Sequence, residues 1–387
     1  MSRAIGVVTV ARSDYGHLTP LLRELRDAPD VELLVYVAGS HLAARFGYTA
    51  RLVEADGWPI AARVDMDIDD DTPGAIAAAT GRGVTRFARE LARRTPDLLV
   101  LLGDRYEMLS AAVAALPFAL PVAHLHGGEV TEGVIDEQVR HALTKVAHLH
   151  FAATPDYARR ILQMGEEPWR VSSPGAPGLD RFRTMRYLSG AELGERLGLP
   201  LRGPTILVTF HPVTLDLGAT EGHVDELLAA LEDVEGDLIM TYPGADAGSH
   251  RVIERVSRFA EARPRTRLVR SLGDDVYASL LRQADLMVGN SSSGVIEAAS
   301  FALPAVNIGD RQRGRVRAAN VIDVGHGRDE IAAGIRRALS PDFRPPLAGL
   351  RNPYGDGHAA PRIVSVLARV ELGPRLITKR FVDLPRA

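Results

Sequence analysis

Three carboxylates have residue types and spacing that suit acid–base chemistry. Glu129 and Asp136 lie in the stretch 124–150, HLHGGEVTEGVIDEQVRHALTKVAHLH, which also holds five histidines, and Asp104 precedes it in a Gly-Asp-Arg turn. Two carboxylates whose environments separate their pKa values can serve as acid and base in one site. His126 adds an imidazole, which can transfer protons near neutral pH. We therefore interpret this stretch as one half of a catalytic site.

Asp136 also has a structural interpretation. It can be the N-cap of a helix from Glu137 to Lys145, with an i,i+4 ion pair to Arg140. On that helix His141 and Lys145 share a face, so the sequence predicts a basic stripe beside the site. Neither a Ser-His-Asp arrangement nor an HExxH motif is present, which disfavours acyl transfer and zinc-peptidase chemistry.

A second polar segment, GNSSSG at residues 289–294, stands between a predicted strand and a predicted helix. Small residues let a phosphate approach the backbone, hydroxyls add donors, and a helix N-terminus attracts anions. The segment therefore predicts a diphosphate cradle, although it lacks the P-loop lysine and the GxGxxG spacing. A serine-capped helix start is the alternative. Glu297, one turn further, can reach a ribose diol or be a helix-surface acid.

Three other positions suit an anionic ligand. His211 follows a predicted strand from Thr205, and Arg311 lies in an arginine-rich loop after a predicted strand at 305–308. Arg12 follows the first predicted strand, before a helix predicted from His17, where free N–H groups attract anions. A structural histidine and solvated surface arginines are the alternatives.

These polar groups follow predicted buried strands, and ligands of open α/β sheets bind outside the carboxyl ends of the strands. Strands and helices alternate from Ala4 to Leu125, and the same alternation restarts at Thr205 after a Pro/Gly-rich stretch at 173–180 and a polar segment. The pattern predicts an α/β protein with two doubly wound parallel sheets.

Composition narrows the functional class. A chain of 387 residues is longer than the length at which a single hydrophobic core stops growing, which favours two domains. Its net charge of -3 gives no general attraction to nucleic acid or to a membrane. Without cysteine there are no disulfides and no thiolate metal sites. The acidic run at 65–71 does not match a calcium loop and predicts a solvated loop. No apolar run approaches the ~18 residues of a membrane span, so we expect a cytoplasmic enzyme or binding protein.

Five segments together resemble the UDP-N-acetylglucosamine 2-epimerase family, and are nearer to its hydrolysing branch in sialic and nonulosonic acid synthesis. They are GDRYEMLSAA, PVAHLHGGEVTEGVIDEQVRHALTKVAHLHF, TFHPVT, MVGNSSSGVIEA and NIGDRQRGR. The resemblance implies a GT-B-like fold with two Rossmann-like domains facing a cleft. Residues 1–185 would carry the carboxylates, 186–362 would bind the nucleotide diphosphate, and 363–387 would return to the first domain. It also implies no cofactor, no metal, and a homodimer or homotetramer.

The reaction implied by the resemblance has two stages. UDP is eliminated across C1 and C2 of UDP-N-acetylglucosamine to leave a 2-acetamidoglycal, and water then adds to give the free manno-configured sugar. A nucleotide-linked 2,4-diacetamido sugar is the alternative substrate. Gly244 stands where some relatives carry a nucleotide-contacting asparagine, which leaves UDP and GDP both open.

Matching by motif places Asp104 and Asp136 on catalytic acids of the family, and Glu129, His126 and His211 are further catalytic candidates. Glu129 matches the second glutamate of the family's His-x-Glu-Gly-Gly-Glu pattern, and His126 stands where that pattern has its first, catalytic glutamate. The binding residues expected for the nucleotide and its diphosphate are Arg12, Arg105, His211, Ser291, Ser292, Glu297 and Arg311. Three competing functions stay open: a GT-B glycosyltransferase, a non-hydrolysing epimerase and a non-catalytic nucleotide-sugar sensor.

Overall fold

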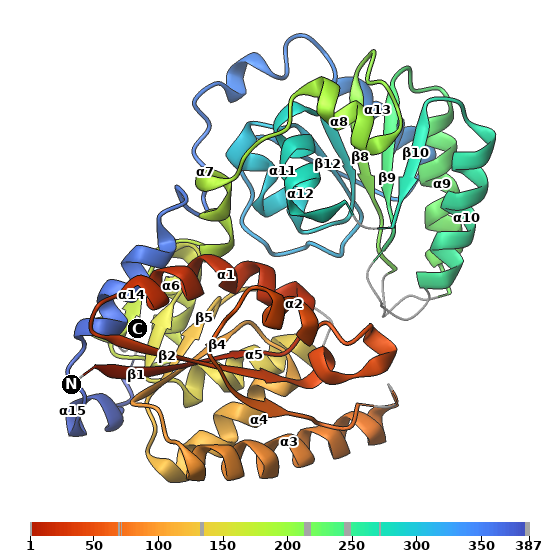
Figure 1. The fold of residues 1–387 in the computed structure, drawn as a ribbon. Helices are drawn as coiled ribbons and strands as arrows, with labels where there is room; N and C mark the ends of the chain where they lie inside the picture. The colour runs from red at the N-terminus through yellow and green to blue at the C-terminus, as the bar shows by residue number, and fades with distance from the viewer. Residues whose placement is uncertain are drawn as a thin grey trace. The chain divides into compact units, whose positions relative to one another are not determined.

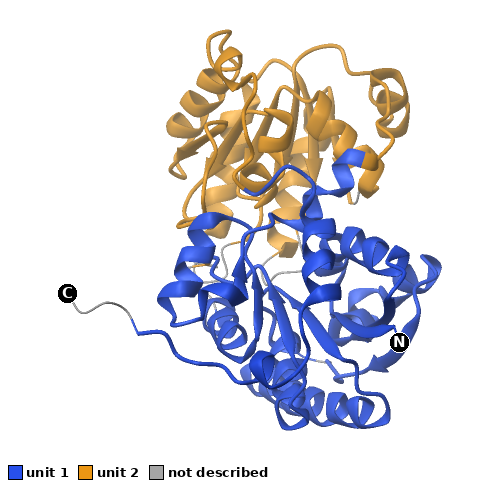
Figure 2. Cartoon of the chain, turned by 90° about the vertical axis from the view of Figure 1, so that its left-hand side faces the viewer, with its two compact units in different colours: residues 1–130, 134–183, 354–387 blue, residues 131–133, 184–353 orange. Residues whose placement is uncertain are grey.

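The computed structural model describes residues 2–68, 70, 72–131, 135–212, 218–243, 249–270 and 272–383. The chain divides into two compact units (Figure 2). Unit 1 comprises residues 1–130, 134–183 and 354–387, and unit 2 comprises residues 131–133 and 184–353. The sequence-based divisions lie at 185/186 and 362/363, and the helix at 359–369 packs on the core of unit 1.

Unit 1 is built on a seven-stranded parallel sheet in the order β3-β2-β1-β4-β5-β6-β7. Its central strands are continuous runs of apolar residues, as expected for a sheet buried on both faces. The edge strand β3 (Ile60–Val64) was not predicted, because its sequence IAARV is partly exposed and weakly apolar. The other strands are β1 (Arg3–Thr9), β2 (Val31–Ala38), β4 (Leu98–Leu102), β5 (Val122–Leu125), β6 (Leu149–Phe151) and β7 (Val171–Ser172).

Helices cover both faces of this sheet (Figure 1). Leucines of α1 and aliphatic residues of α14 form one core with β1 and β2, and residues of α3, α4 and α5 form a second core on the other face. The helices of unit 1 are α1 (Arg12–Asp27), α2 (Ala50–Ala55), α3 (Pro73–Arg93), α4 (Tyr106–Ala115), α5 (Ile135–Val146), α6 (Pro155–Gln163), α14 (Ala359–Arg369) and α15 (Pro374–Ile377), with α7 (Arg181–Thr184) where the chain leaves the unit.

Unit 2 repeats this architecture with a six-stranded parallel sheet in the order β10-β9-β8-β11-β12-β13. Helices α9, α10 and α13 form one core with the sheet. The strands are β8 (Thr205–Thr209), β9 (Asp237–Thr241), β10 (Thr266–Val269), β11 (Leu286–Gly289), β12 (Ala305–Ile308) and β13 (Val321–Val324). The helices are α8 (Gly190–Leu197), α9 (Thr220–Glu232), α10 (Ser249–Ala262), α11 (Gly273–Gln283), α12 (Ser293–Ile296) and α13 (Arg328–Ala338).

Each sheet reverses its strand order once, beside β1 in unit 1 and beside β8 in unit 2. Connections leave such a switch point in opposite directions, which opens a crevice at the carboxyl ends of the strands. The two predicted parallel sheets are therefore confirmed, and each provides one candidate edge for a ligand.

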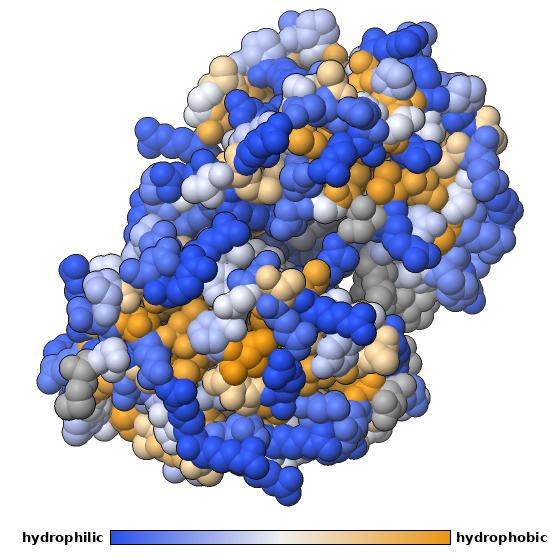
Figure 3. All heavy atoms as spheres, in the orientation of Figure 1, coloured by the Kyte–Doolittle hydropathy of each residue, from blue (hydrophilic) through white to orange (hydrophobic). Residues whose placement is uncertain are grey.

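The face of the molecule in Figure 3 shows apolar residues in patches bordered by hydrophilic ones. Within the described ranges, every helix is too short or too polar to cross a membrane.

Candidate functional site

The three predicted carboxylates meet at the carboxyl edge of the unit 1 sheet. Asp104 follows β4 after one glycine, Glu129 lies in the loop after β5, and Asp136 lies in the first turn of α5. Strands β4 and β5 are neighbours in the sheet, so their carboxyl ends present these residues side by side. A shared partner, Arg140, also connects Asp104 with the Glu129 loop.

Arg140 is the buried centre of this cluster, with a relative exposure of 1%. Its Nε and Nη2 donate to Oδ2 of Asp104 at 3.1 and 2.5 Å, and its Nη1 donates to Oε2 of Glu137 at 2.6 Å and to the backbone carbonyl of Glu129 at 2.7 Å. The predicted Asp136–Arg140 pair is therefore wrong, because Arg140 turns toward Asp104. Asp136 is also not the N-cap, since α5 already begins at Ile135.

Asp136 is half-buried among these charges. Burial, together with the negative charge of Asp104, raises its pKa to about 6 against the opposing effect of Arg105 and Arg140. A carboxyl group with a pKa near 6 exchanges its proton readily at physiological pH. Asp136 is thus suited to proton transfer in a way that an exposed helix-end carboxylate is not.

His126 and Glu129 form a close pair in the loop after β5. The Nδ1 of His126 lies 2.6 Å from Oε1 of Glu129, and the ring of His17 on α1 lies 6.3 Å away between centroids. The backbone of His126 has a φ of 65°, in the left-handed region that a histidine seldom adopts. Such local strain concentrates at functional sites, and it turns this imidazole toward the carboxylate.

The other histidines of the stretch 124–150 have structural partners. Burial lowers the pKa of His124 to about 3, so its neutral ring donates from Nε2 to the carbonyl of Gly103 at 2.7 Å. His148 and His150 are likewise buried, and burial lowers the pKa of both. His141 lies 3.0 Å from Glu137. Five histidines in one stretch therefore provide one candidate for catalysis, His126.

The predicted basic stripe is wrong. Lys145 lies in the last turn of α5, at the opposite end of the helix from Asp136. Its ammonium group donates to Glu166 at 2.6 Å and to the carbonyl of Met164 at 2.9 Å. Because α5 runs away from the carboxyl edge of the sheet, Lys145 cannot border the carboxylates.

The two predicted arginines of unit 1 differ in their surroundings. Arg105 binds the buried Glu107 through two nitrogens at 2.8 and 3.2 Å and also donates to the Ser40 hydroxyl. Burial alone would lower the pKa of Arg105, but Glu107 raises it overall, so the cation is permanent. Arg12 is exposed and is the first residue of α1, which begins five residues before the predicted helix start at His17. Both stay candidate nucleotide contacts.

Asp14 was not predicted, and it joins the polar residues at the end of β1. Its Oδ2 accepts hydrogen bonds from the Thr9 hydroxyl and the Val10 amide, both at 2.9 Å, and Thr9 also contacts His41. Burial raises the pKa of Asp14 to about 6, although these donors and Arg105 lower it. Its only sequence signal is an aspartate at a strand–helix junction, which is too common to single out.

In unit 2 the predicted cradle is fixed by Asn290. Its side chain accepts from the backbone amide of His211 at 2.7 Å and donates to the His211 carbonyl at 2.8 Å. Its own carbonyl accepts from Arg311 at 3.2 Å and from Gln312 at 2.9 Å. The loops after β8, β11 and β12 are thereby held together at the carboxyl edge. Gln312, which is buried, was not predicted because an isolated glutamine carries no pattern.

The serines of the cradle begin the short helix α12. Ser291 accepts a weak bond from the amide of Ser293 at 3.3 Å, and Ser292 occupies the N-cap position without a side-chain capping bond. The Ser293 hydroxyl bonds to Glu297, which is buried and so is not a helix-surface acid. Ser291 and Ser292 lie at the partly exposed carboxyl edge, as a diphosphate contact requires.

His211 completes this edge as a half-buried residue. Burial lowers its pKa to about 3, and the nearby Arg311 lowers it as well. At neutral pH it is therefore an uncharged imidazole, which can donate a hydrogen bond to a phosphate oxygen but adds no positive charge. Gly244, the position considered for nucleotide choice, lies outside the described residues.

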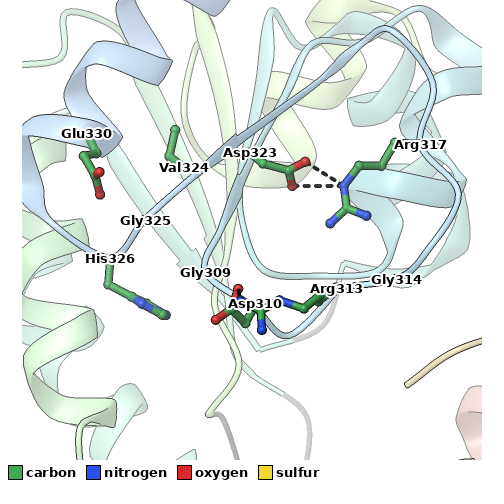
Figure 4. A pocket seen from close by; sticks show the side chains of 10 residues that line it. All are labelled: Gly309, Asp310, Arg313, Gly314, Arg317, Asp323, Val324, Gly325, His326 and Glu330. Atoms are coloured by element: carbon green, nitrogen blue, oxygen red, sulfur yellow. Dashed lines mark hydrogen bonds and ion pairs between the residues drawn. The ribbon is translucent and has the colours of Figure 1, made fainter. Parts of the chain in front are cut away.

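A pocket of about 680 Å³ opens beside this edge (Figure 4). It is lined by Gly309, Asp310, Arg313, Gly314, Arg317, Asp323, Val324, Gly325, His326 and Glu330. Its arginines are already ion-paired, Arg313 with Asp310 at 2.6 Å and Arg317 with Asp323 at 2.7 Å. Arg311, whose guanidinium reaches toward β11 instead, is the better candidate for a diphosphate contact.

Two parallel-sheet α/β units, each with a polar carboxyl edge at its switch point, define a two-domain protein of the GT-B-like class. Comparison with known proteins agrees: residues 23–368 match the family model described as UDP-N-acetylglucosamine 2-epimerase. The chain belongs to the UDP-N-acetylglucosamine 2-epimerase family, and it is an enzyme of that type.

Among similar proteins, the UDP-N,N'-diacetylbacillosamine 2-epimerase (hydrolyzing) of Legionella pneumophila is 35% identical, over 98% of this chain and 99% of that one. The GDP/UDP-N,N'-diacetylbacillosamine 2-epimerase (hydrolyzing) of Campylobacter jejuni is 34% identical, over 83% and 84%. The solved structure of UDP-GlcNAc 2-epimerase from Neisseria meningitidis bound to UDP-GlcNAc has a TM-score of 0.72 at 17% identity, covering 94% of this chain and 99% of that chain. That likeness supports the fold.

Proposed function

We propose that this protein is a hydrolysing 2-epimerase, which converts a UDP-linked 2-acetamido sugar and water into UDP and the free sugar with inverted configuration at C2. The observation that carries the proposal is the meeting of Asp104, Asp136 and the His126–Glu129 pair at one sheet edge, with the pKa of Asp136 raised to about 6, chiefly by burial. Relatives that carry the word hydrolyzing in their names support the same reaction.

The first stage is an elimination. A base takes the proton from C2, the electrons of that C–H bond form the C1–C2 double bond, and the C1–O bond breaks with its electron pair leaving on UDP. The second stage adds the oxygen of water to C1 and a proton to C2. Inversion at C2 requires that the proton leaves from one face of the sugar and returns on the other, so two proton-transfer groups are needed.

The residues of unit 1 can divide these tasks. We assign removal of the C2 proton to Asp104, whose carboxylate is fixed by Arg140. We assign the returning proton to Asp136, because an acid must carry a proton near neutral pH, which a pKa of about 6 permits. The His126–Glu129 pair is then available to handle the proton of the water that attacks C1.

The residues of unit 2 suit the leaving group. Ser291 and Ser292 offer hydroxyls at the start of α12, Arg311 offers a guanidinium, and the neutral His211 offers a hydrogen-bond donor. Positioned donors and a cation stabilise charge that develops on a departing diphosphate. Glu297 is the candidate contact for the ribose.

For the sugar itself we propose a 2,4-diacetamido sugar as the first substrate to test, with UDP-N-acetylglucosamine second. The two relatives named above are described as 2-epimerases of UDP-N,N'-diacetylbacillosamine and of GDP/UDP-N,N'-diacetylbacillosamine. A relative from Neisseria meningitidis that is 30% identical is described as a UDP-N-acetylglucosamine 2-epimerase. The elimination needs only the 2-acetamido group and the anomeric diphosphate, so both sugars fit the chemistry.

Proton NMR in deuterated water tests the proposal. The protein is incubated with each UDP-sugar alone, and we expect UDP together with a free sugar that carries deuterium at C2. A sugar released only when an acceptor is added would indicate a glycosyltransferase. Deuterium at C2 of a sugar still linked to UDP would indicate a non-hydrolysing epimerase. Saturable binding of both UDP-sugars without any turnover would indicate a sensor and overturn the proposal.

A further inference from the structure

We propose that Arg140 is a positioning residue for this reaction: it fixes the geometry and the charge of the Asp104–Asp136 pair without touching the sugar. The inference rests on the proposed function for its effect on turnover. It rests on the structure alone for its effect on the carboxylates.

The contacts of Arg140 bring together three segments that the chain keeps apart. Two of its nitrogens donate to the same oxygen of Asp104, which directs that carboxylate from the end of β4. A third nitrogen holds the carbonyl of Glu129 in the loop after β5 and the carboxylate of Glu137 on α5. Every proton-transfer group proposed above therefore stands on a segment that Arg140 fixes.

Burial separates this role from substrate binding. Only 1% of Arg140 is exposed, so a sugar bound at the carboxyl edge cannot reach its guanidinium. A residue of this kind acts on the rate of the chemical step through its neighbours and leaves the affinity for substrate unchanged.

A second buried arginine in the same unit shows what a purely structural role looks like. Arg170 is 2% exposed and donates to the backbone carbonyls of His148, Arg375, Leu376 and Thr378, with Glu167 as its carboxylate partner. Its bonds fasten the C-terminal segment to unit 1. Arg140 instead holds a carboxylate of the proposed acid–base pair, and its charge acts on Asp136 directly.

The first experiment compares Arg140→Lys with Arg170→Lys in the full chain. Lysine keeps the charge but loses the planar fork that binds one oxygen twice. We expect both variants to lose stability. For Arg140→Lys we also expect kcat to fall about 10- to 100-fold, the range typical of residues that orient metal ligands from the outer shell, with KM within about 3-fold. Arg170→Lys should keep the kcat of the wild type per folded molecule.

The second experiment needs no substrate. Aspartate labelled with carbon-13 in its carboxyl group lets NMR follow the titration of Asp136, assigned by its loss in Asp136→Asn. The double variant Arg140→Met, Glu137→Gln removes the cation together with its half-buried carboxylate partner, which favours folding, and Glu137→Gln alone is its control. We expect Asp136 to titrate at higher pH in the double variant than in the control, because Arg140 lowers the pKa of Asp136.

These outcomes separate the two proposals. If the wild type turns over neither sugar, the proposed function fails, while the titration still tests the effect of Arg140 on Asp136. A wild-type kcat in Arg140→Lys, an equal loss of kcat in Arg170→Lys, or an unchanged titration of Asp136 in the double variant would each show that Arg140 is only structural.

Discussion

The side-chain amide of Asn290 and the backbone of His211 exchange two hydrogen bonds, 2.7 and 2.8 Å long, between the ends of β11 and β8. These strands are neighbours at the switch point of unit 2. The exchange orients the loop that carries His211 toward the start of α12, so the donors proposed for the diphosphate are arranged before a ligand binds. Preorganised donors of this kind lose little entropy on binding.

Replacing Asn290 by alanine should therefore weaken UDP binding. Asn290 is fully buried, and its loss leaves the amide and carbonyl of His211 without this partner, which costs roughly 1–3 kcal/mol of stability. Asn320→Ala is the matched control, because Asn320 is equally buried and donates to the carbonyl of Leu303 at the other edge of the sheet. Isothermal titration with UDP should show a raised Kd for Asn290→Ala only. Equal affinities in both variants would contradict the prediction.

Replacing Asp136 by asparagine should abolish turnover while the protein stays folded. Asparagine keeps the shape of the side chain but cannot carry the proton, and loss of a general acid typically costs 10²–10⁴-fold in rate. The control variant is Asp156→Asn, because Asp156 is an exposed carboxylate that also lies in the first turn of a helix, α6. Turnover and thermal unfolding are measured on both. Retained turnover with lowered stability would favour the structural role of Asp136.

Replacing His126 by asparagine should slow the reaction and preserve the loop. Asparagine tolerates a φ near 65° better than most residues, so the backbone can stay in place while the imidazole next to Glu129 is lost. We expect a fall of about 10²-fold or more in kcat. The control variant is His141→Asn. The ring of His141 contacts Glu137 on α5, and we expect its replacement to change kcat little. Equal kcat values in the two variants would contradict a role for His126 in proton transfer.

The stability of unit 1 should fall as Asp14 ionises. Burial raises the folded-state pKa of Asp14 to about 6, above the value near 3.9 of an unfolded chain. The contribution of neutral Asp14 to the free energy of unfolding is therefore fully present below pH ~4 and is lost as the pH rises through about 6. Relative to Asp14→Asn, the wild type should lose up to about 3 kcal/mol of unfolding free energy between pH 4 and 7.

Urea unfolding followed by tryptophan fluorescence checks this dependence on Asp14. The chain has two tryptophans, Trp58 and Trp169, and both lie in unit 1. The exposed variant Asp156→Asn should follow the wild type at every pH. A difference between wild type and Asp14→Asn that does not change with pH would mean that the carboxyl of Asp14 is not shifted by burial.

Local patterns in the sequence were sufficient for the fold and for where the chemistry gathers. Apolar runs and the polar turns that close them predict most of the strands and helices. Because parallel strands end at a common edge, the same patterns place Asp104 and Glu129 together before any coordinates are known. The edge strand β3 was not predicted, because an exposed strand carries only a weak apolar signal.

Only the tertiary structure decided which of these side chains can act. The pairing of Arg140 with Asp104, 36 residues apart in the chain, replaces the local pair with Asp136 that helix spacing suggests. Burial makes His124 neutral and raises the pKa of Asp136, although neither residue differs in type from its exposed counterparts. Sequence fixes residue types and short-range order. Desolvation and through-space charge depend on every segment that packs around a group, so they arise only when the chain has folded.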